Sequence, residues 1–212
     1  VFGRPAPPGP LTGPDSPREA DFPRYTDNAG ANPRGDHAIA LLSGARDLTP
    51  DALRRIAYDA HMPFFETAIP ALERAFAALP ANDARRRRLA DPVALLARWD
   101  RRWAADSQAT SVAAFWAAEL WELAGAETGG APEYDTRWQR IAALPDQARL
   151  AALTMAVERL ERDFGRWRVP WGEINRFQRN DGAIRQTFDD ARPSTPVPFA
   201  SARWGSLASF SA

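Results

Sequence analysis

The sequence contains no cysteine and no lysine in its 212 residues. Without cysteine, the chain forms no disulfide bond, no thiolate metal site and no cysteine nucleophile. All basic residues are arginine, and 27 acidic residues balance the 27 arginines, so net charge favours neither a nucleic acid nor an anionic membrane. The longest apolar runs end well before the roughly 20 residues that a membrane-spanning helix needs. We therefore expect no nucleic acid and no membrane as partner.

Three segments of different character follow one another along the chain. Residues 1–33 are rich in proline and glycine and lack apolar periodicity, which predicts an extended segment. Residues 34–165 show helical periodicity and form the predicted helical domain. Residues 166–212 are aromatic and interrupted by prolines, which predicts a strand and turn segment belonging to an incomplete sheet. The expected fold class is mainly α, with a few short strands at the C-terminal end.

About six helices are expected in the helical domain, and two of them begin with a capping residue followed by proline. Thr49 before Pro50 is one such start, and Asp91 before Pro92 is the other. Pro70 predicts a kink within a third helix. The helix predicted to begin at Pro92 is expected to direct four side chains to the core, namely Leu95, Leu96, Trp99 and Trp103.

Three stretches near the C-terminal end have the composition of strands and turns: INRFQR, IRQTF and PVPFASARW. Strands this few and this short do not bury a sheet on their own. Together with the extended first segment, they predict that the chain packs against a partner that this sequence does not contain.

The two histidines are the first candidates for acid–base or metal chemistry. His37 lies beside Asp36 near a predicted helix start, and His61 precedes Met62 and Pro63 at a helix end. Neither histidine has a second one at a metal-binding spacing such as H-x-x-x-H. Capping or packing is therefore the preferred interpretation of both, and no metal site is predicted.

The charged clusters favour structural roles over chemistry. The run ARRRRLAD at residues 84–91 lies between two predicted helices in a neutral chain, which favours a solvated loop or helix end over a nucleic-acid contact. Glu119 and Glu122 are one helical turn apart, which favours a solvated edge or an ion pair with a nearby arginine. Asp189 and Asp190 form a second acidic pair. No Gly-rich phosphate loop, G-x-S-x-G or S-x-x-K motif is present, so motifs alone indicate no enzyme.

Five stretches carry a family resemblance when they are taken in order: ANPRGDHAIALL, DALRRIAYDAHMPFFETAIPALERAFAAL, LLARWDRRWAADSQATSVAAFWAAELW, WGEINRFQR and FDDARPSTPVPFASARWGSLASF. They resemble the later part of the catalytic subunit of penicillin-acylase-like enzymes, a family that includes acyl-homoserine-lactone acylases and cephalosporin acylases. The resemblance covers most of the chain from about residue 24 onward, and WGEINRF with the C-terminal stretch is its most specific part.

This resemblance implies a self-processing N-terminal-nucleophile hydrolase with an αββα core, in which a first-position serine attacks an amide carbonyl and its own α-amine takes the proton. Residue 1 here is Val1, which cannot attack, and cleavage at Gly205–Ser206 would release only a short peptide. Asn28 and Asn32 do not repeat the context of the family's oxyanion-stabilising asparagine. We therefore expect the helical insertion segment of such an acylase, a fragment that is catalytically silent alone and has no catalytic residue, cofactor or metal.

One substrate-binding residue is implied by the resemblance. In penicillin acylases an arginine that opens the first helix of this segment lies close to the active site, and Arg34 in ANPRGDHAI matches that position. Its guanidinium would pair with a substrate carboxylate or brace the oxyanion asparagine, and a structural tie between loop and helix is the alternative. The implied partners are the remainder of the acylase and a small-molecule amide substrate, and the implied location is periplasmic or secreted.

Two other functions stay open at this point. A free-standing helical interaction module without catalysis is the main alternative to the acylase fragment. A nucleic-acid binder depends on the arginine run alone and is the weakest hypothesis.

Overall fold

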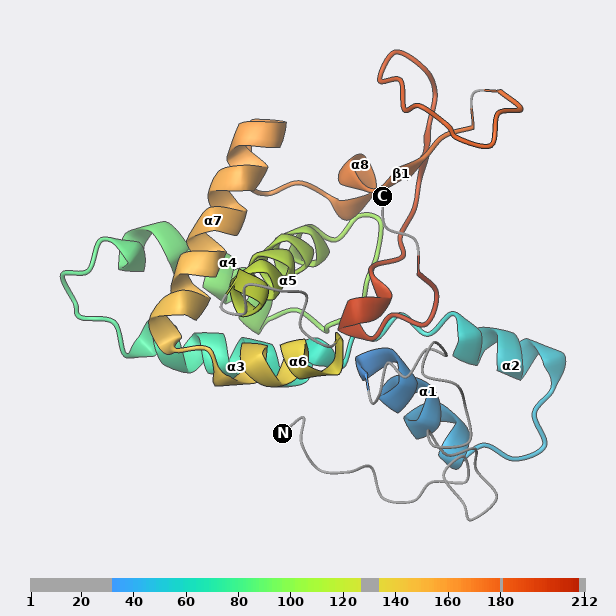
Figure 1. The fold of residues 1–212 in the computed structure, drawn as a ribbon, viewed down its shortest axis with the longest axis horizontal. Helices are drawn as coiled ribbons and strands as arrows, with labels where there is room; N and C mark the ends of the chain where they lie inside the picture. Colours follow the sequence, from blue (N-terminus) through green and yellow to red (C-terminus); the bar gives the residue numbers. More distant parts are fainter. Residues whose placement is uncertain (1–31, 127–133, 180, 210–212) are drawn as a thin grey trace.

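The structure is a computed structural model that describes residues 32–126, 134–179 and 181–209. Nearly all of the predicted extended segment, together with Asn28, lies outside the described residues. The described part is mainly α, as the sequence predicts (Figure 1). Its helices are α1 (Pro33–Ser43), α2 (Pro50–Ala57), α3 (Phe64–Ala77), α4 (Arg85–Ala97), α5 (Gln108–Ala126), α6 (Tyr134–Ala143), α7 (Asp146–Phe164), α8 (Trp171–Ile174) and the 3₁₀ helix η2 (Ala202–Trp204).

The core lies among α3, α4, α5 and α7, with α6 against α5 (Figure 1). Trp116 of α5 is fully buried, and its indole Nε1 donates a hydrogen bond to the Arg149 carbonyl of α7 at 3.2 Å. The indole thus fills the space between the two longest helices and fixes their register. None of the described helices is long and apolar enough to cross a membrane.

Helix α4 begins at Arg85, earlier than the predicted start at Asp91 and Pro92. The Asp83 carboxylate accepts hydrogen bonds from the Arg85 backbone N–H and from its guanidinium Nε, both at 2.9 Å. This upstream carboxylate satisfies an orphan N–H of the first turn, so the helix can start there and continue through a buried Pro92. The arginine run is therefore the first turn of a helix and not a loop.

Because α4 also ends at Ala97, the two tryptophans predicted to share its face are separated. Trp99 is buried in the core as expected. Trp103, which like Trp99 lies beyond the end of the helix, is partly buried against the core and packs edge-on against Phe199, with ring centroids 5.1 Å apart. The sequence pattern also missed α6.

Local sequence signals mark the starts of α1 and α2, which are capped by polar side chains, and the end of α7, which stops at a glycine. The Asn32 side chain accepts from the Gly35 N–H at 3.0 Å, and the Thr49 hydroxyl accepts from the Ala52 N–H at 3.2 Å. Helix α7 stops at Gly165, whose φ of 73° lies in the left-handed region that glycine adopts readily.

The strands are β1 (Arg176–Phe177) and β2 (Thr195–Pro196), which pair antiparallel at the base of a projecting arm (Figure 1). The predicted strand IRQTF is not a strand; it lies in the loop of this arm.

The two most specific stretches of the sequence pack against each other at the base of the arm. The Asn175 side-chain amide donates to the carbonyl oxygens of Val197, at 3.1 Å, and Phe199, at 2.9 Å. Gly172 passes so close to Ala105 and Pro196 that an added Cβ would lie 2.9 Å from the Pro196 ring. WGEIN thus orients the chain that leads into residues 202–206, called the C-terminal turn below.

Candidate functional site

Arg34, the predicted site residue, is the second residue of α1 and is exposed to solvent. In the part of the chain that the structure describes, no carboxylate forms an ion pair with its guanidinium. The N-terminus of a helix carries a partial positive charge, which disfavours a cation and favours an anion. Arg34 therefore adds positive charge where the helix already has it, which favours a carboxylate or an oxyanion, while Asp36 in the same first turn offsets part of that charge.

The first turns of α1 lie against the C-terminal turn (Figure 1). His37, one turn after Arg34, is 6% exposed, and its Nδ1 lies 2.8 Å from the carbonyl oxygen of Gly205. Because a carbonyl only accepts, Nδ1 carries the proton. Gly205 has φ of 96°, and a Cβ there would lie 2.4 Å from the Pro63 ring. Glycine is thus required to present this carbonyl to His37.

Asp59 joins His37 to two further segments. Its Oδ1 lies 3.4 Å from His37 Nε2 and accepts from the His61 backbone N–H at 2.8 Å, and its Oδ2 accepts from the Arg102 guanidinium at 2.9 Å. Burial alone would raise the pKa of Asp59, but these donors outweigh burial and hold the pKa below its usual value. The carboxylate therefore stays charged between two cationic or polar neighbours.

The second histidine joins the same cluster. His61 Nε2 lies 2.8 Å from Glu66 Oε1, and its ring meets the His37 ring edge-on with centroids 5.7 Å apart. In the described residues, no group of three or more histidine and acidic side chains is arranged to hold a metal ion. The cluster is therefore an interlocked set of ion pairs and hydrogen bonds that fixes the position of α1.

The described residues offer no serine activated by a histidine. The two buried serines, Ser111 and Ser206, donate to the backbone carbonyls of Val169 and Ala208. Asn32 acts as the cap of α1. None of these groups is arranged as a nucleophile and base pair.

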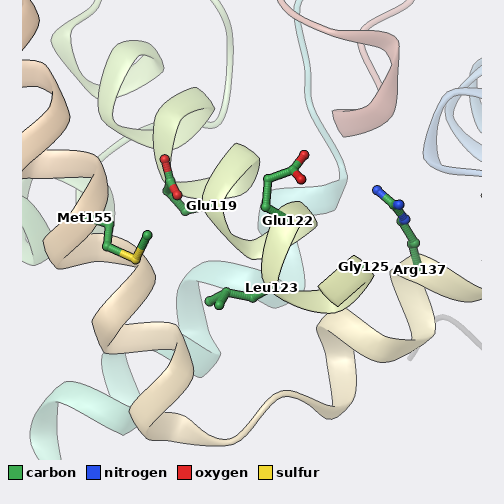
Figure 2. A pocket seen from close by; sticks show the side chains of 6 residues that line it. All are labelled: Glu119, Glu122, Leu123, Gly125, Arg137 and Met155. Carbon is green, nitrogen blue, oxygen red and sulfur yellow. The ribbon is translucent and has the colours of Figure 1, made fainter. Parts of the chain in front are cut away.

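A separate shallow groove of about 390 Å³ lies between α5, α6 and α7. Figure 2 shows its acidic side chains, Glu119 and Glu122, on α5, with Arg137 on α6 and Met155 on α7. Glu119 pairs with Arg159 at 3.5 Å, which is the ion pair that the sequence suggested. The groove holds no nucleophile and lies apart from α1.

The arginine run is occupied by contacts within the chain. Arg86 donates to the Ala77 and Leu79 carbonyls at the end of α3, and Arg88 pairs with Glu161 of α7. Arg85 reaches Asp83, as described above. Three of the four consecutive arginines thus serve packing between helices. The other acidic pair is exposed, and its Asp189 pairs with Arg192 at 3.5 Å.

The family resemblance suggested Arg34 as a site residue, which stays a prediction, and sequence reasoning treated His37 and His61 as unrelated residues. The contact between His37 and Gly205 spans 168 positions. No spacing rule connects positions so far apart. The sequence contains one local hint of a tight turn, which is that Gly205 follows an aromatic residue, Trp204; in the structure Gly205 has a positive φ and Trp204 is buried.

Comparison with known proteins gives one family. The sequence model described as penicillin amidase matches residues 12–201 of this chain. A search of curated proteins finds no match. The matched range includes the first helix with Arg34, the helical core and the WGEIN stretch.

Proposed function

The chain belongs to the penicillin amidase family, and we propose that it forms the helical part of an acylase that hydrolyses the amide bond of a small acylated molecule. The substrate class is that of penicillins, cephalosporins and N-acyl homoserine lactones. The remainder of the enzyme supplies the N-terminal nucleophile and the sheets of an αββα core. On its own this chain is catalytically silent, and the enzyme acts in the periplasm or outside the cell.

The observation that carries the proposal is the exposed position of the Arg34 guanidinium at the start of α1. It is exposed at the start of an 11-residue helix, and no described carboxylate pairs with it. A planar guanidinium in that position can make two parallel hydrogen bonds to a substrate carboxylate, or can hold an asparagine that stabilises the oxyanion. Its charge is not needed for any contact within the described chain.

Uncovered apolar surface supports a large partner. Helix α2 has no buried residue, although its apolar residues fall on one face. Leu53 and Tyr58 are 50% and 55% exposed, and on the arm Ile184 is fully exposed. Tyr58 has one ring contact, to Phe199 with centroids 5.8 Å apart, and otherwise these apolar side chains stay largely exposed in the described residues. Exposed apolar residues gathered on one element mark an interaction surface. The remainder of the acylase is the partner that we assign to this surface.

The proposal is tested by comparing two purified samples on penicillin G, a cephalosporin and an N-acyl homoserine lactone. The chain alone should release no amine product, whereas the complete acylase that contains it should release the amine from at least one substrate. Turnover by the chain alone would refute the assignment of the nucleophile. Absence of turnover by the complete protein on all acyl amides would favour the helical interaction module.

A further inference from the structure

We propose that His37 is the positioning residue for Arg34: it fixes the first turns of α1 against the C-terminal turn, and so sets where the guanidinium points. This inference rests on the proposed function, because it assigns His37 a role in the same site. It follows from three contacts that meet at one buried ring.

The first contact fixes the helix to the tail. His37 is 6% exposed and donates from Nδ1 to the Gly205 carbonyl at 2.8 Å. The position of Gly205 is fixed by its neighbour Trp204, which is 4% exposed. The Trp204 ring packs against the Phe64 ring, with centroids 4.9 Å apart. The helix is thus hydrogen-bonded to a turn that is itself anchored in the core.

The second and third contacts fix the rotation of the ring. His37 Nε2 faces Asp59 at 3.4 Å, and Arg102 holds the other oxygen of that carboxylate. The His61 ring meets the His37 ring edge-on, with Glu66 on its far side. The hydrogen bond at Nδ1, the Asp59 carboxylate facing Nε2 and the edge-on His61 ring together favour a single orientation of the imidazole.

Arg34 lies one helical turn before this ring, so its backbone position depends on where His37 holds the helix. Positioning matters because a displacement of about 1 Å can cost on the order of 100-fold in rate. His37 itself is buried beneath the surface that Arg34 presents. It acts on the reaction through the arginine and not by touching the substrate.

The test is a double-mutant cycle in the complete acylase, with kcat/KM and amide exchange of the C-terminal turn as readouts. His37→Asn keeps a donor near the Nδ1 position, and His37→Gln moves the donor toward Nε2. We expect His37→Gln to lower kcat/KM about 5- to 10-fold and to speed amide exchange in the C-terminal turn. His37→Asn should keep most of the kcat/KM and most of the protection of the turn from exchange. Ser43→Ala, which removes an exposed α1 side chain that bonds only the Ile39 carbonyl, is the matched control.

In the Arg34→Ala background, His37→Gln should cause no further loss of kcat/KM. Additive losses would overturn the inference, as would a loosened turn with unchanged kcat/KM. If His37→Gln does not fold, Asp59→Asn replaces it and should show the same non-additivity. An active enzyme in which Arg34→Ala has no effect would overturn the role of Arg34 and of His37 together, whereas inactivity of the unmodified enzyme would refute only the proposed function.

Discussion

The indole Nε1 of Trp171 donates a hydrogen bond to the carbonyl oxygen of Phe199 at 3.0 Å. This bond joins the WGEIN stretch to the segment that enters the C-terminal turn. Within that turn, the Gly205 carbonyl accepts a hydrogen bond from His37 of α1. Hydrogen bonds at Phe199 and at Gly205 therefore tie this segment to the base of the arm at one end and to the helix that carries Arg34 at the other.

Asn175→Ala should destabilise the chain by about 1–3 kcal/mol, because it removes the side-chain donor of the Val197 carbonyl and leaves the Phe199 carbonyl with Trp171 as its donor. Urea denaturation of the full chain measures the change. Arg185→Ala, which removes an exposed side chain from the arm, is the control and should change stability by less than about 0.5 kcal/mol. Equal effects of the two variants would show that the arm is not anchored through Asn175.

Gly205→Ala should lower the free energy of unfolding by about 2–5 kcal/mol, because alanine is strained at this positive φ and its Cβ would overlap the Pro63 ring. Substitutions at two other glycines separate the cost of the positive φ from the cost of the overlap. Gly165→Ala has the positive φ but open space, and should cost about 1–2 kcal/mol. Gly44→Ala has neither and should be neutral or slightly stabilising. Thermal unfolding of the three variants should rank them in that order, and a harmless Gly205→Ala would contradict the packing of the turn.

The Asp83 carboxyl should titrate at an unusually low pH. Hydrogen bonds from the Arg85 guanidinium and backbone N–H lower the pKa of Asp83 from 3.8 to about 2. Because the folded pKa lies below the ordinary value, this contribution to stability is present above about pH 4 and is lost as pH falls toward 2. Nuclear magnetic resonance of the carboxyl carbon measures the pKa directly. Arg85→Gln should return it toward 3.8, and an unshifted pKa in the unmodified chain would contradict the start assigned to α4.

The sequence predicted what is decided locally and missed what is decided at long range. Thr49 and Gly165 begin and end helices through contacts within a few residues, so pattern reading found both. The predicted start of α4 was wrong, because the Asp83 carboxylate accepts from the Arg85 N–H upstream and the helix continues through Asp91 and Pro92. The cluster around His37 could not be predicted, because its members come from segments that meet only when the core forms.

The same distinction applies to the site. Arg34 was proposed through the family resemblance, and its place at the start of α1 is a local property. What holds that helix in place is tertiary, since the Asp59 carboxylate and the Gly205 carbonyl both come from separate segments that follow α1 in the chain.

The measurement that tests the central claim most directly is kcat/KM of the complete acylase with Arg34→Ala. A lost charge-assisted hydrogen bond of roughly 1.5–3 kcal/mol should lower kcat/KM by roughly 10- to 150-fold, with self-cleavage preserved. Arg34→Lys should rescue it partly, because an ammonium keeps the charge without the bidentate contact. Arg46→Ala, an exposed arginine at the other end of α1 that bonds only backbone carbonyls, is the matched control and should leave kcat/KM unchanged. Unchanged kcat/KM in Arg34→Ala with a lowered Tm would contradict the claim and reduce Arg34 to a structural tie.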